Sequence, residues 1–563
     1  MTTILSTNGT PLTTSACTTP GGYIALGITG KTLAVFSLLN KKVHFLSPSG
    51  LKEMNMKMTF GATWCDEHYN EFDEKKEMVV FNHKRLATDV ITACQAAGPY
   101  AEALERRVGV WKMKDGQLVV NGRQLWRPDG TVLEHGIHEG RVYPDCGNVH
   151  FDRDTPEATE AEVSKILAAF NSPNWIHPMG GEMVLGYIGV GLVSVALTHR
   201  PHLLMTGPAA CGKSTVLEYV QWLMGDLAYA CTGPQTLAAY YQRLGGTSKV
   251  VVNDEFEADP TRKACKDTFE IARISYSLQE GNEGIVRGTV TGEAKSYPFY
   301  APFIAAGISP GKMEPADLTR WVILEAKGKP QGQRLTKAEA DDIGPKLARL
   351  FINRWGVFQA SEVVVRQRIL ALGGDGRMAD TVGTFLASYW TFVSATPATD
   401  ADADFLVSML GIEQRIADQA VGDELHCLEA LTSRVVPFKV MTGPALVTRQ
   451  LSIGQAIEAV CKDPTGQPEI VMRLAQLGLR VAFLKGKWSL FVANSHTHQE
   501  LRKLFSGSKW AAGGWSVVLR RLLGGEESTQ RIGAGLGASK VTSIDVPQHL
   551  LPVFDEEELL LAA

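Results

Sequence analysis

The chain has 563 residues, a length that predicts three or four domains at roughly 150 residues each. Hydrophobic residues make up 45% of the sequence and charged residues 21%, which is typical of soluble globular proteins. The formal net charge is only −4, which excludes the strongly basic character of many nucleic-acid and membrane-surface proteins. Any basic binding surface must therefore be local.

The cysteines and the most hydrophobic segment indicate the compartment. The nine cysteines form neither a C-x-x-C pair nor a Cys/His cluster, so we expect no zinc site and no disulfide framework. The N-terminal residues lack the basic start and hydrophobic core of a signal peptide. Residues 183–198 are the most hydrophobic stretch, but they fall short of the roughly 20 residues that a membrane-spanning helix needs. We expect a buried helix there, a cytoplasmic protein and no membrane partner.

The first 150 residues predict a small α+β domain behind a flexible start. Residues 1–21 are rich in Ser, Thr and Gly, and we expect them to be flexible. In residues 22–150, the strand-like runs YIALGI, TLAVFSLL and KVHFLSP precede the helical run HKRLATDVITACQAAG. A hairpin turn is expected at Asp115-Gly116.

Further boundaries follow from composition and periodicity. The run TPEATEAEVSKILAAF predicts a helix capped by Thr155, and SATPATDADAD has the small polar residues of a linker. We therefore expect a core domain at 151–330, a helical lid at 331–393, a linker at 394–404, a C-terminal α/β domain at 405–545 and an acidic tail at 546–563.

The run HLLMTGPAACGKSTVLEYV contains the pattern G-x-x-x-x-G-K-[ST] between a strand-like and a helical segment. Backbone N–H groups and the helix N-terminus attract phosphates, Lys213 reaches the β- and γ-phosphates, and the Ser214 hydroxyl suits Mg²⁺. The alternative is a Gly-rich connector. The pattern predicts an ATP site made by Gly207, Pro208, Ala209, Ala210, Cys211, Gly212, Lys213, Ser214 and Thr215.

A second acidic site follows in KVVVNDEFE, where three valines of a buried strand precede the acids. Asp254 is expected to hold Mg²⁺, and Glu255 to orient and polarise the attacking water. The alternative is a strand that ends in a solvated acidic turn. Together the two motifs predict an α/β P-loop ATPase core that uses ATP and Mg²⁺.

Other segments extend the pattern beyond a generic ATPase. They are ARISYSLQEGNEGIVRGTVTGEAKSYPFYAPFIAAGISP, EPADLTRWVILEAK, GYIGVGLVSVALTHRPHLLMTGPA and GGDGRMADTVGTFLASYW. In their order they resemble the helicase portion of phage, prophage and plasmid primase-helicases, which are related to superfamily-three helicases of the AAA+ type. The resemblance implies a replicative DNA helicase or translocase that forms a ring, most often a hexamer, and moves 3′ to 5′ on single-stranded or forked DNA.

The resemblance also implies a DNA-binding hairpin in the pore of that ring. The matching run is GIVRGTVTGEAKSYPFY, with a turn at Thr291-Gly292. Lys295 would hold a backbone phosphate, and Arg287 would assist it. The alternative is an ordinary hairpin with solvated charges.

The segment ADLTRWVILE implies, by the same resemblance, that Arg320 is an arginine finger for the site of a neighbouring subunit. An ion pair between Arg320 and Asp317 is the alternative. Related ATPases carry a polar sensor at the end of the preceding strand, where this chain has Gly307. The role passes only weakly to Ser309.

Residues 1–150 lack the acidic cluster of a primase, so a primase, a polymerase or a single-strand-binding protein is a possible partner. A metal site is one interpretation of Asp66, Glu67 and His68, but a surface helix is favoured.

The C-terminal region is locally basic. Residues 471–523 carry nine Lys or Arg against one acid, a balance of +8, with interleaved Trp and Phe. This mixture fits either base stacking on a DNA-binding surface or a core domain with a solvated basic face.

Two other functions share the ATP site. A regulatory ATPase, such as a helicase loader or a defence switch, needs the nucleotide but not the hairpin. A DNA-packaging motor is a third possibility, although no nuclease cluster accompanies it. We therefore expect an ATP hydrolase coupled to DNA unwinding, with the regulatory ATPase as the alternative.

Overall fold

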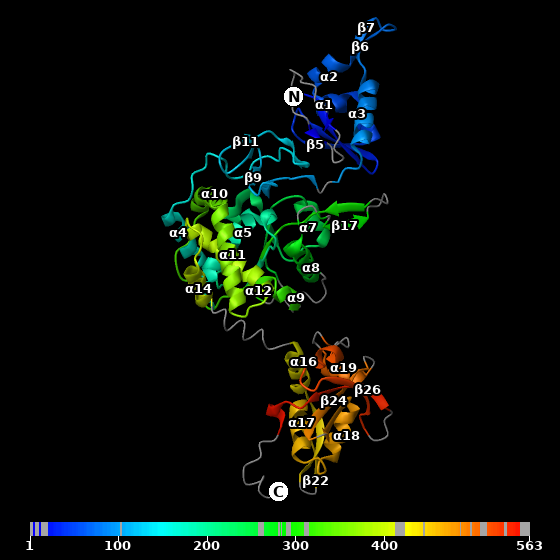
Figure 1. Cartoon of the computed structure of the whole chain (residues 1–563), viewed down its shortest axis with the longest axis vertical. Helices are drawn as coiled ribbons and strands as arrows, with labels where there is room; N and C mark the ends of the chain where they lie inside the picture. Colours follow the sequence, from blue (N-terminus) through cyan, green and yellow to red (C-terminus); the bar gives the residue numbers. More distant parts are fainter. Residues whose placement is uncertain are drawn as a thin grey trace. The chain divides into compact units, whose positions relative to one another are not determined.

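The computed structural model describes residues 4–5, 11–12, 21–101, 104–256, 264–279, 282, 284–288, 294–308, 313, 315–410, 423–442, 445–484, 486–495, 498–506, 510, 515–533 and 538–551. The chain divides into two compact units, Met1–Glu413 and Gln414–Ala563, and each is described by itself (Figure 1).

The three strands and the helix predicted within residues 22–98 are present in the first unit, as β3, β4, β5 and α3, together with further elements that were not predicted. Its elements are β1 (Ile4–Leu5), β2 (Pro11–Leu12), β3 (Tyr23–Thr29), β4 (Thr32–Ser37), β5 (Val43–Leu46), η1 (Pro48–Gly50), α1 (Glu53–Phe60), α2 (Ala62–Tyr69), β6 (Asn70–Asp73), β7 (Met78–Phe81) and α3 (His83–Ala97). An antiparallel sheet of β3, β4 and β5 packs against α3, which buries Leu86, Val90 and Cys94. The helix stops before Gly98, as the sequence predicts.

Short antiparallel strands follow. They are β8 (Gly109–Lys112), β9 (Leu118–Asn121), β10 (Leu125–Trp126), β11 (Val132–Leu133), β12 (Gly136–His138) and β13 (Arg141–Tyr143). The predicted turn at Asp115-Gly116 is confirmed. It joins β8 to β9, and the Asp115 carboxylate accepts the backbone N–H of Gln117 over 2.9 Å.

The core of the first unit is a five-stranded parallel sheet. Its elements are α4 (Glu160–Phe170), α5 (Gly180–Leu192), η3 (Ser194–Ala196), β14 (His202–Thr206), α6 (Lys213–Met224), η4 (Gly225–Leu227), β15 (Ala228–Thr232), α7 (Leu237–Leu244), β16 (Val250–Asp254), α8 (Ala264–Ser277), β17 (Ile285–Gly288), β18 (Ala294–Tyr297), β19 (Phe303–Ala306), α9 (Pro315–Leu318) and β20 (Trp321–Glu325). The strand order is β15-β16-β19-β14-β20. This sheet with its helices fits the α/β class predicted for the core.

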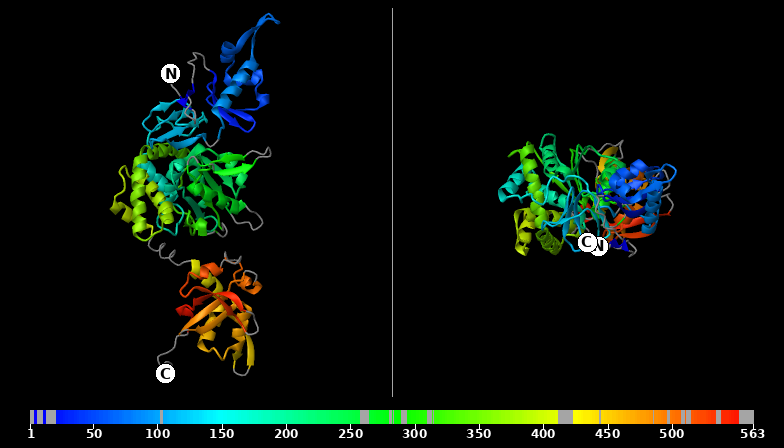
Figure 2. Two further views of the ribbon diagram at one scale, coloured as in Figure 1. Left: turned by 45° about the vertical axis from the view of Figure 1, so that its right-hand side comes forward. Right: turned by 90° about the horizontal axis from the view of Figure 1, so that it is seen from above.

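Helices cover both faces of this sheet (Figures 1 and 2). Val251 packs in a cluster with residues of α7 and α8, whereas Val250 lies against Gly191 of α5. Because successive side chains of a strand point to opposite faces, α5 lies across the sheet from α7 and α8. Twelve of the thirteen residues of α5 are buried, so the expected buried helix is confirmed.

The segment after the sheet is helical, as predicted. It contains α10 (Lys337–Asn353), α11 (Trp355–Ala371), α12 (Gly376–Met378), the π-helical η5 (Ala379–Gly383), α13 (Thr384–Val393) and α14 (Asp400–Met409).

The structure differs from the sequence analysis at the linker expected for 394–404. Thr399 and Asp402 form a capping box that begins α14, and Ala403 and Leu406 are buried in the packing of α14 on α11. The small polar residues that suggested a linker are therefore a helix start, and the two units divide between Glu413 and Gln414. The start of α4 is a similar correction. Thr159 caps that helix, while the hydroxyl of Thr155 bonds to Asp152.

The second unit has the mixed α/β character that the sequence predicts. Its elements are α16 (Asp423–Thr432), β21 (Val435–Thr442), β22 (Ala445–Ser452), α17 (Ile453–Lys462), α18 (Pro468–Gln476), β23 (Leu479–Leu484), β24 (Lys487–Ala493), α19 (Gln499–Leu504), α20 (Trp515–Leu519), β25 (Glu526–Arg531), β26 (Ala538–Asp545) and η6 (Gln548–Leu550). An antiparallel sheet in the order β23-β24-β26-β25 forms its centre.

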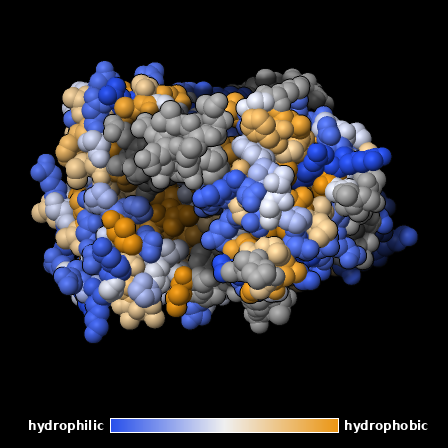
Figure 3. Space-filling view, turned by 90° about the horizontal axis from the view of Figure 1, so that it is seen from below, coloured by the Kyte–Doolittle hydropathy of each residue, from blue (hydrophilic) through white to orange (hydrophobic). Residues whose placement is uncertain are grey.

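Two features are absent from the described residues. No described helix combines the length and the hydrophobicity needed to cross a lipid bilayer. No group of three or more His, Cys, Asp or Glu side chains in the described ranges is arranged to hold a metal ion. On the face seen in Figure 3, hydrophobic and hydrophilic residues are interspersed.

Candidate nucleotide and nucleic-acid sites

The predicted phosphate-binding loop joins β14 to α6. Gly207 has a φ of 136°, and a Cβ there would lie 2.3 Å from the carbonyl oxygen of Ala326, so this position requires glycine. Ala210 also has a positive φ, 60°, which is a strained conformation for a residue with a side chain. No described side chain caps the N-terminus of α6, so its first N–H groups are left for an anion.

Lys213 is the first residue of α6, and its side chain folds back onto this loop. Its Nζ donates to the carbonyl oxygens of Gly207 and Pro208, each over 2.8 Å, and lies 3.5 Å from the buried Cys211 Sγ. The side chain is buried, and the neutral carbonyls hold the ammonium group against the loop. Phosphate oxygens would be stronger acceptors than these carbonyls because they carry negative charge.

The two predicted acids lie at the end of β16. Asp254 is the last residue of the strand, and its carboxylate accepts the N–H of Glu255 over 2.9 Å. Glu255 has a φ of 52°, and the next residue, Phe256, donates its N–H to the carbonyl oxygen of Ala306. A left-handed conformation at a non-glycine residue is costly, and such strain is concentrated at functional sites. Below the turn, Asn253 is fully buried and donates to the Tyr240 hydroxyl over 3.3 Å.

The strand register brings the loop and the acids to one edge of the sheet. In β19, Ala305 pairs with Asn253 of β16, and Ala306 pairs with Met205 of β14. Asp254 is therefore level with the end of β14, where the loop begins. The two strands are separated only by β19, which places them roughly 10 Å apart at a spacing of about 4.8 Å per strand. Ligands of open α/β sheets bind at this carboxyl edge.

These residues fit a triphosphate with Mg²⁺. The uncapped helix and the glycine loop suit phosphates, and one carboxylate with one hydroxyl matches the usual protein ligands of Mg²⁺. Ser214 is exposed and Asp254 is half-buried, so both are accessible. The bound nucleotide would supply the other oxygen ligands and the bond to be cleaved. The individual roles of these residues stay predictions.

Arg320 lies at the opposite end of the sheet. It precedes β20, and its carbonyl oxygen accepts the N–H of His202, the first residue of β14. The guanidinium group lies 5.5 Å from the centre of the Tyr276 ring and donates to the carbonyl oxygen of Ala316. Burial and the neighbouring Arg377 lower the pKa of Arg320. Asp317 forms a bidentate pair with Arg273, at 2.7 and 3.2 Å, rather than the ion pair with Arg320 that the sequence suggested.

The predicted hairpin is present in its described residues. β17 and β18 pair antiparallel, and Arg287 is the direct register partner of Lys295. The expected turn at Thr291-Gly292 and the sensor position Ser309 lie outside the described residues.

The structure corrects the base-stacking interpretation of the C-terminal aromatic residues. Trp515 and Phe505 are fully buried and stack on each other, with ring centres 5.0 Å apart, and Phe491 and Trp510 are also buried. These rings form the core of the second unit, and they cannot stack on DNA bases. Phe491 of β24, Phe505 directly after α19 and Trp515 of α20 all point inward, an arrangement that the spacing in the sequence does not reveal.

The sequence did not indicate that Arg377 lies near Arg320. Arg377, which is exposed, also lies over the Tyr276 ring, at 5.8 Å from its centre. Arg320 and Arg377 are 57 positions apart in the chain, so no local sequence pattern indicates that they are neighbours.

The metal-site interpretation of Asp66, Glu67 and His68 has no support among the described residues. Lys57 pairs with Asp66, and His68 bonds to the Trp64 carbonyl.

Comparisons with known proteins give remote similarities. No family model matches the chain, and none of the curated proteins matches it. The chain is similar to a solved structure described as "SCCmec type IV Cch - active helicase", with 14% identity, a TM-score of 0.43 and coverage of 92% of this chain and 90% of that chain. It is also similar to "The apo structure of NrS-1 C terminal region (305-718)", with 11% identity, a TM-score of 0.36 and coverage of 92% and 94%. These values are too low for a functional conclusion, and the site above is independent of them.

Proposed function

We propose that the chain is an ATP-dependent DNA helicase or translocase of a phage or similar mobile element, acting as a ring of subunits on single-stranded or forked DNA. A six-membered ring and 3′ to 5′ movement are the forms that the family resemblance implies. ATP with Mg²⁺ would bind at the carboxyl edge of the sheet, held by the 207–215 loop and Asp254. Glu255 would position the water that attacks the γ-phosphate.

One observation carries this proposal: the predicted catalytic residues divide between two ends of one sheet. The loop, Asp254 and Glu255 lie at the carboxyl edge, whereas Arg320 precedes the five-residue strand β20. At about 3.3 Å per residue, that strand separates Arg320 from the edge by roughly 16 Å. Arg320 is therefore remote from the nucleotide site of its own subunit. At an interface between subunits, Arg320 of one subunit would lie beside the 207–215 loop of the next, and there it could act in catalysis.

The second unit supports a nucleic-acid partner by its order of elements. α17 and α18 pack together across a five-residue connection, 463–467, and the hairpin of β23 and β24 follows. This order is that of a helix-turn-helix followed by a β-hairpin, a frequent DNA-binding arrangement. Val471 and Met472 of α18 are exposed, and Arg473 lies beside them. This surface replaces aromatic stacking as the DNA contact that we propose for the unit.

The test is the rate of ATP hydrolysis with and without single-stranded DNA, together with particle mass in ATP. Stimulation by DNA in an assembly of ring size is expected. Lys213→Ala should abolish both hydrolysis and unwinding, because the loop then lacks its cation. Lys295→Ala should abolish unwinding while basal hydrolysis continues, since Lys295 is not among the residues proposed to bind the nucleotide.

The matched control is Lys84→Ala, which removes an exposed lysine from α3. It should change neither activity. Hydrolysis that ignores DNA, in an enzyme indifferent to Lys295→Ala, would favour the regulatory ATPase. Unwinding at the parental rate by Lys213→Ala would refute the coupling of ATP to DNA.

A further inference from the structure

A basic cleft lies beside the ATPase core and outside the nucleotide site. Its cavity is about 370 Å³ and is lined on one side by Lys112, Lys114 and Arg141, from β8, the turn after it and β13. Thr198 and Gln279, from the core, line the other side. We call these five residues the basic cleft. A cavity of this size is at the lower end of the range of small-ligand pockets, so it suits about one nucleotide.

The basic cleft has an excess of positive charge. Glu139 is its acidic lining residue, and the Glu139 carboxylate accepts the backbone N–H of Lys114 over 2.8 Å. Among the described residues, none of the three cationic groups lies within 4.0 Å of a carboxylate oxygen. Lys112 also interacts electrostatically with Glu362 of α11, but burial raises the pKa of that carboxyl and so opposes its negative charge. Cations left unpaired in a concave site favour an anionic ligand.

The two sides of the basic cleft are fixed to each other. Trp111, Met113 and Tyr143 pack in one buried cluster with Val195 and Tyr300 of the core. Met113, Tyr143 and Val195 of this cluster also line the basic cleft, so packing fixes its two sides relative to each other.

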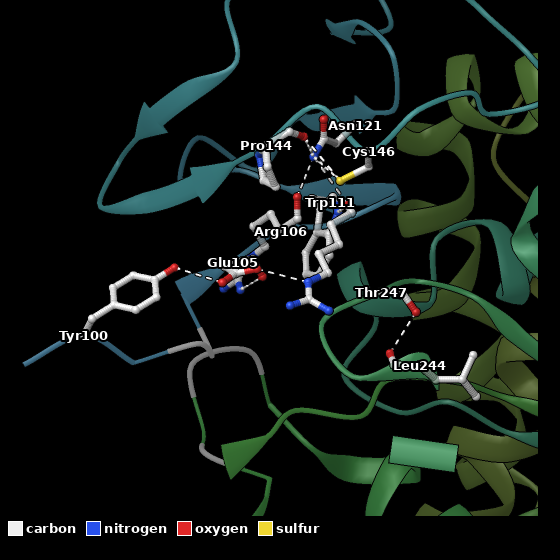
Figure 4. A network of polar contacts seen from close by, with 10 residues as sticks. Tyr100, Glu105, Arg106, Trp111, Asn121, Pro144, Cys146, Leu244 and Thr247 are labelled. Atoms are coloured by element: carbon white, nitrogen blue, oxygen red, sulfur yellow. Dashed lines mark hydrogen bonds and ion pairs between the residues drawn. The ribbon is translucent and has the colours of Figure 1, made fainter. Parts of the chain in front are cut away.

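Backbone contacts hold β8 to the core. The Val110 N–H donates to the Ser248 hydroxyl over 3.0 Å, and a Cβ at Gly109 would lie 1.8 Å from that hydroxyl, so only glycine allows the approach. Figure 4 shows the polar network at the start of β8, where the Asn121 amide donates to the carbonyl oxygens of Arg106 and Pro144.

A short stretch of chain links the basic cleft to the proposed DNA hairpin, and its six residues can span at most about 22 Å. Gln279 follows the end of α8, and its amide donates to the carbonyl oxygens of Thr198 and Ser277 over 3.0 and 3.2 Å. The first hairpin strand, β17, begins only six positions later at Ile285. Lys114, Thr198 and Gln279 are exposed, so a chain-like ligand can enter and leave along the rim.

From this placement we propose that the basic cleft binds the phosphodiester backbone of single-stranded DNA next to the hairpin. Lys112, Lys114 and Arg141 would neutralise phosphates, and the Thr198 hydroxyl would add a neutral donor, while the Gln279 amide, whose two N–H groups bond to the carbonyl oxygens of Thr198 and Ser277, would hold that rim in place. Such contacts read no sequence, which suits a motor that moves along any strand. The inference rests on the proposed function, because it extends the DNA path from the hairpin to β8 and β13.

The test uses the full chain with Lys114→Ala and Arg141→Ala combined. Binding of a fluorescent oligothymidylate is measured by anisotropy over a range of salt concentrations. If each cation neutralises one phosphate, the slope of log affinity against log salt becomes less steep by about 1.4, at about 0.7 per contact on single strands. Affinity at low salt should fall about tenfold, while hydrolysis without DNA stays at the parental rate.

Two further variants serve as controls for this test. Lys31→Ala with Lys84→Ala removes the same charge from exposed positions elsewhere and should keep the parental slope. Lys114→Arg with Arg141→Lys keeps both charges and should also retain it, which separates a phosphate contact from a folding defect. A slope unchanged from the parent in the double alanine variant would overturn the proposal.

A free nucleotide is the competing ligand. Loss of ADP or pyrophosphate binding, with oligothymidylate binding intact, would assign the basic cleft to free phosphates and would also overturn the proposal. The proposed function fails separately, if DNA does not stimulate hydrolysis by the parent. Oligonucleotide affinity measured without hydrolysis still reports on the basic cleft in that case.

Discussion

Replacing His202 with glutamine tests whether the sheet that carries the phosphate-binding loop is built around an uncharged imidazole. His202 begins β14 and is fully buried. The Phe303 N–H donates to Nδ1 over 3.1 Å, so the proton of the neutral ring lies on Nε2, which donates to the Ala272 carbonyl over 2.9 Å. The pKa of His202 is lowered from 6.5 to about 3, chiefly by burial; the hydrogen bond to Ala272 acts in the opposite direction, and nearby Arg320 and Arg200 contribute to the lowering.

The sign of the pH effect follows from these two pKa values. Below about pH 6.5 the unfolded chain binds a proton that the folded core excludes, so stability falls as the pH falls toward about 3. The folded and unfolded pKa values of His202 differ by about 3.5, and each pKa unit corresponds to 1.36 kcal/mol, so the total loss of folding stability is at most about 5 kcal/mol. About 2 kcal/mol of it develops between about pH 7.5 and pH 5. His202→Gln removes the titrating group, so the variant should lose about 2 kcal/mol less over this interval.

Hydrogen exchange by mass spectrometry on peptides covering β14 measures the free energy of opening in parent and variant. Intrinsic exchange rates cancel between the two proteins at each pH. Glutamine keeps an N–H donor but leaves the Phe303 N–H without its acceptor, which adds a pH-independent cost of about 1–3 kcal/mol. His150, whose pKa burial lowers to about 4, titrates in both proteins and cancels. An equal pH dependence in parent and variant would refute the reasoning.

Four further changes test other parts of the structure. Glu255→Gln should slow hydrolysis by about 100-fold or more while ATP binding persists; a parental rate would remove the water-positioning role. Arg320→Ala should be inactive alone. Mixed with Lys213→Ala, it should regain activity at those subunit interfaces where an intact Lys213 of one subunit meets an intact Arg320 of the next; a mixture that stays inactive would contradict action in trans. Trp515→Ala should destabilise the second unit by about 3–5 kcal/mol in urea unfolding without changing basal hydrolysis. Ser248→Ala should lower the stability of β8 by about 1–3 kcal/mol, because the Val110 N–H loses its acceptor. Hydrogen exchange in β8 should then be faster; an unchanged exchange rate would contradict this role of Ser248.

Much of the first unit was predictable because its signals are local. A turn such as Asp115-Gly116, or a helix that stops at Gly98, is set by residues that are neighbours in the chain. The phosphate-binding loop is similar, since its glycines, Lys213 and the following helix form one continuous segment. Local sequence also misled, however, where one composition serves two purposes: the run at 394–404 is polar enough for a linker, yet it caps and begins α14.

The sequence by itself determined which segments form a glycine-containing loop before a helix, a hairpin or a strand, because backbone preference and residue periodicity act over a few residues. Only the tertiary structure decided the environment of each side chain. It paired Asp317 with Arg273 rather than Arg320, buried Trp515 in a core, and gathered Lys112 and Arg141 from separate strands into one cleft. Those outcomes depend on packing between distant segments, and the energy of a charge or an aromatic ring depends on what surrounds it in space.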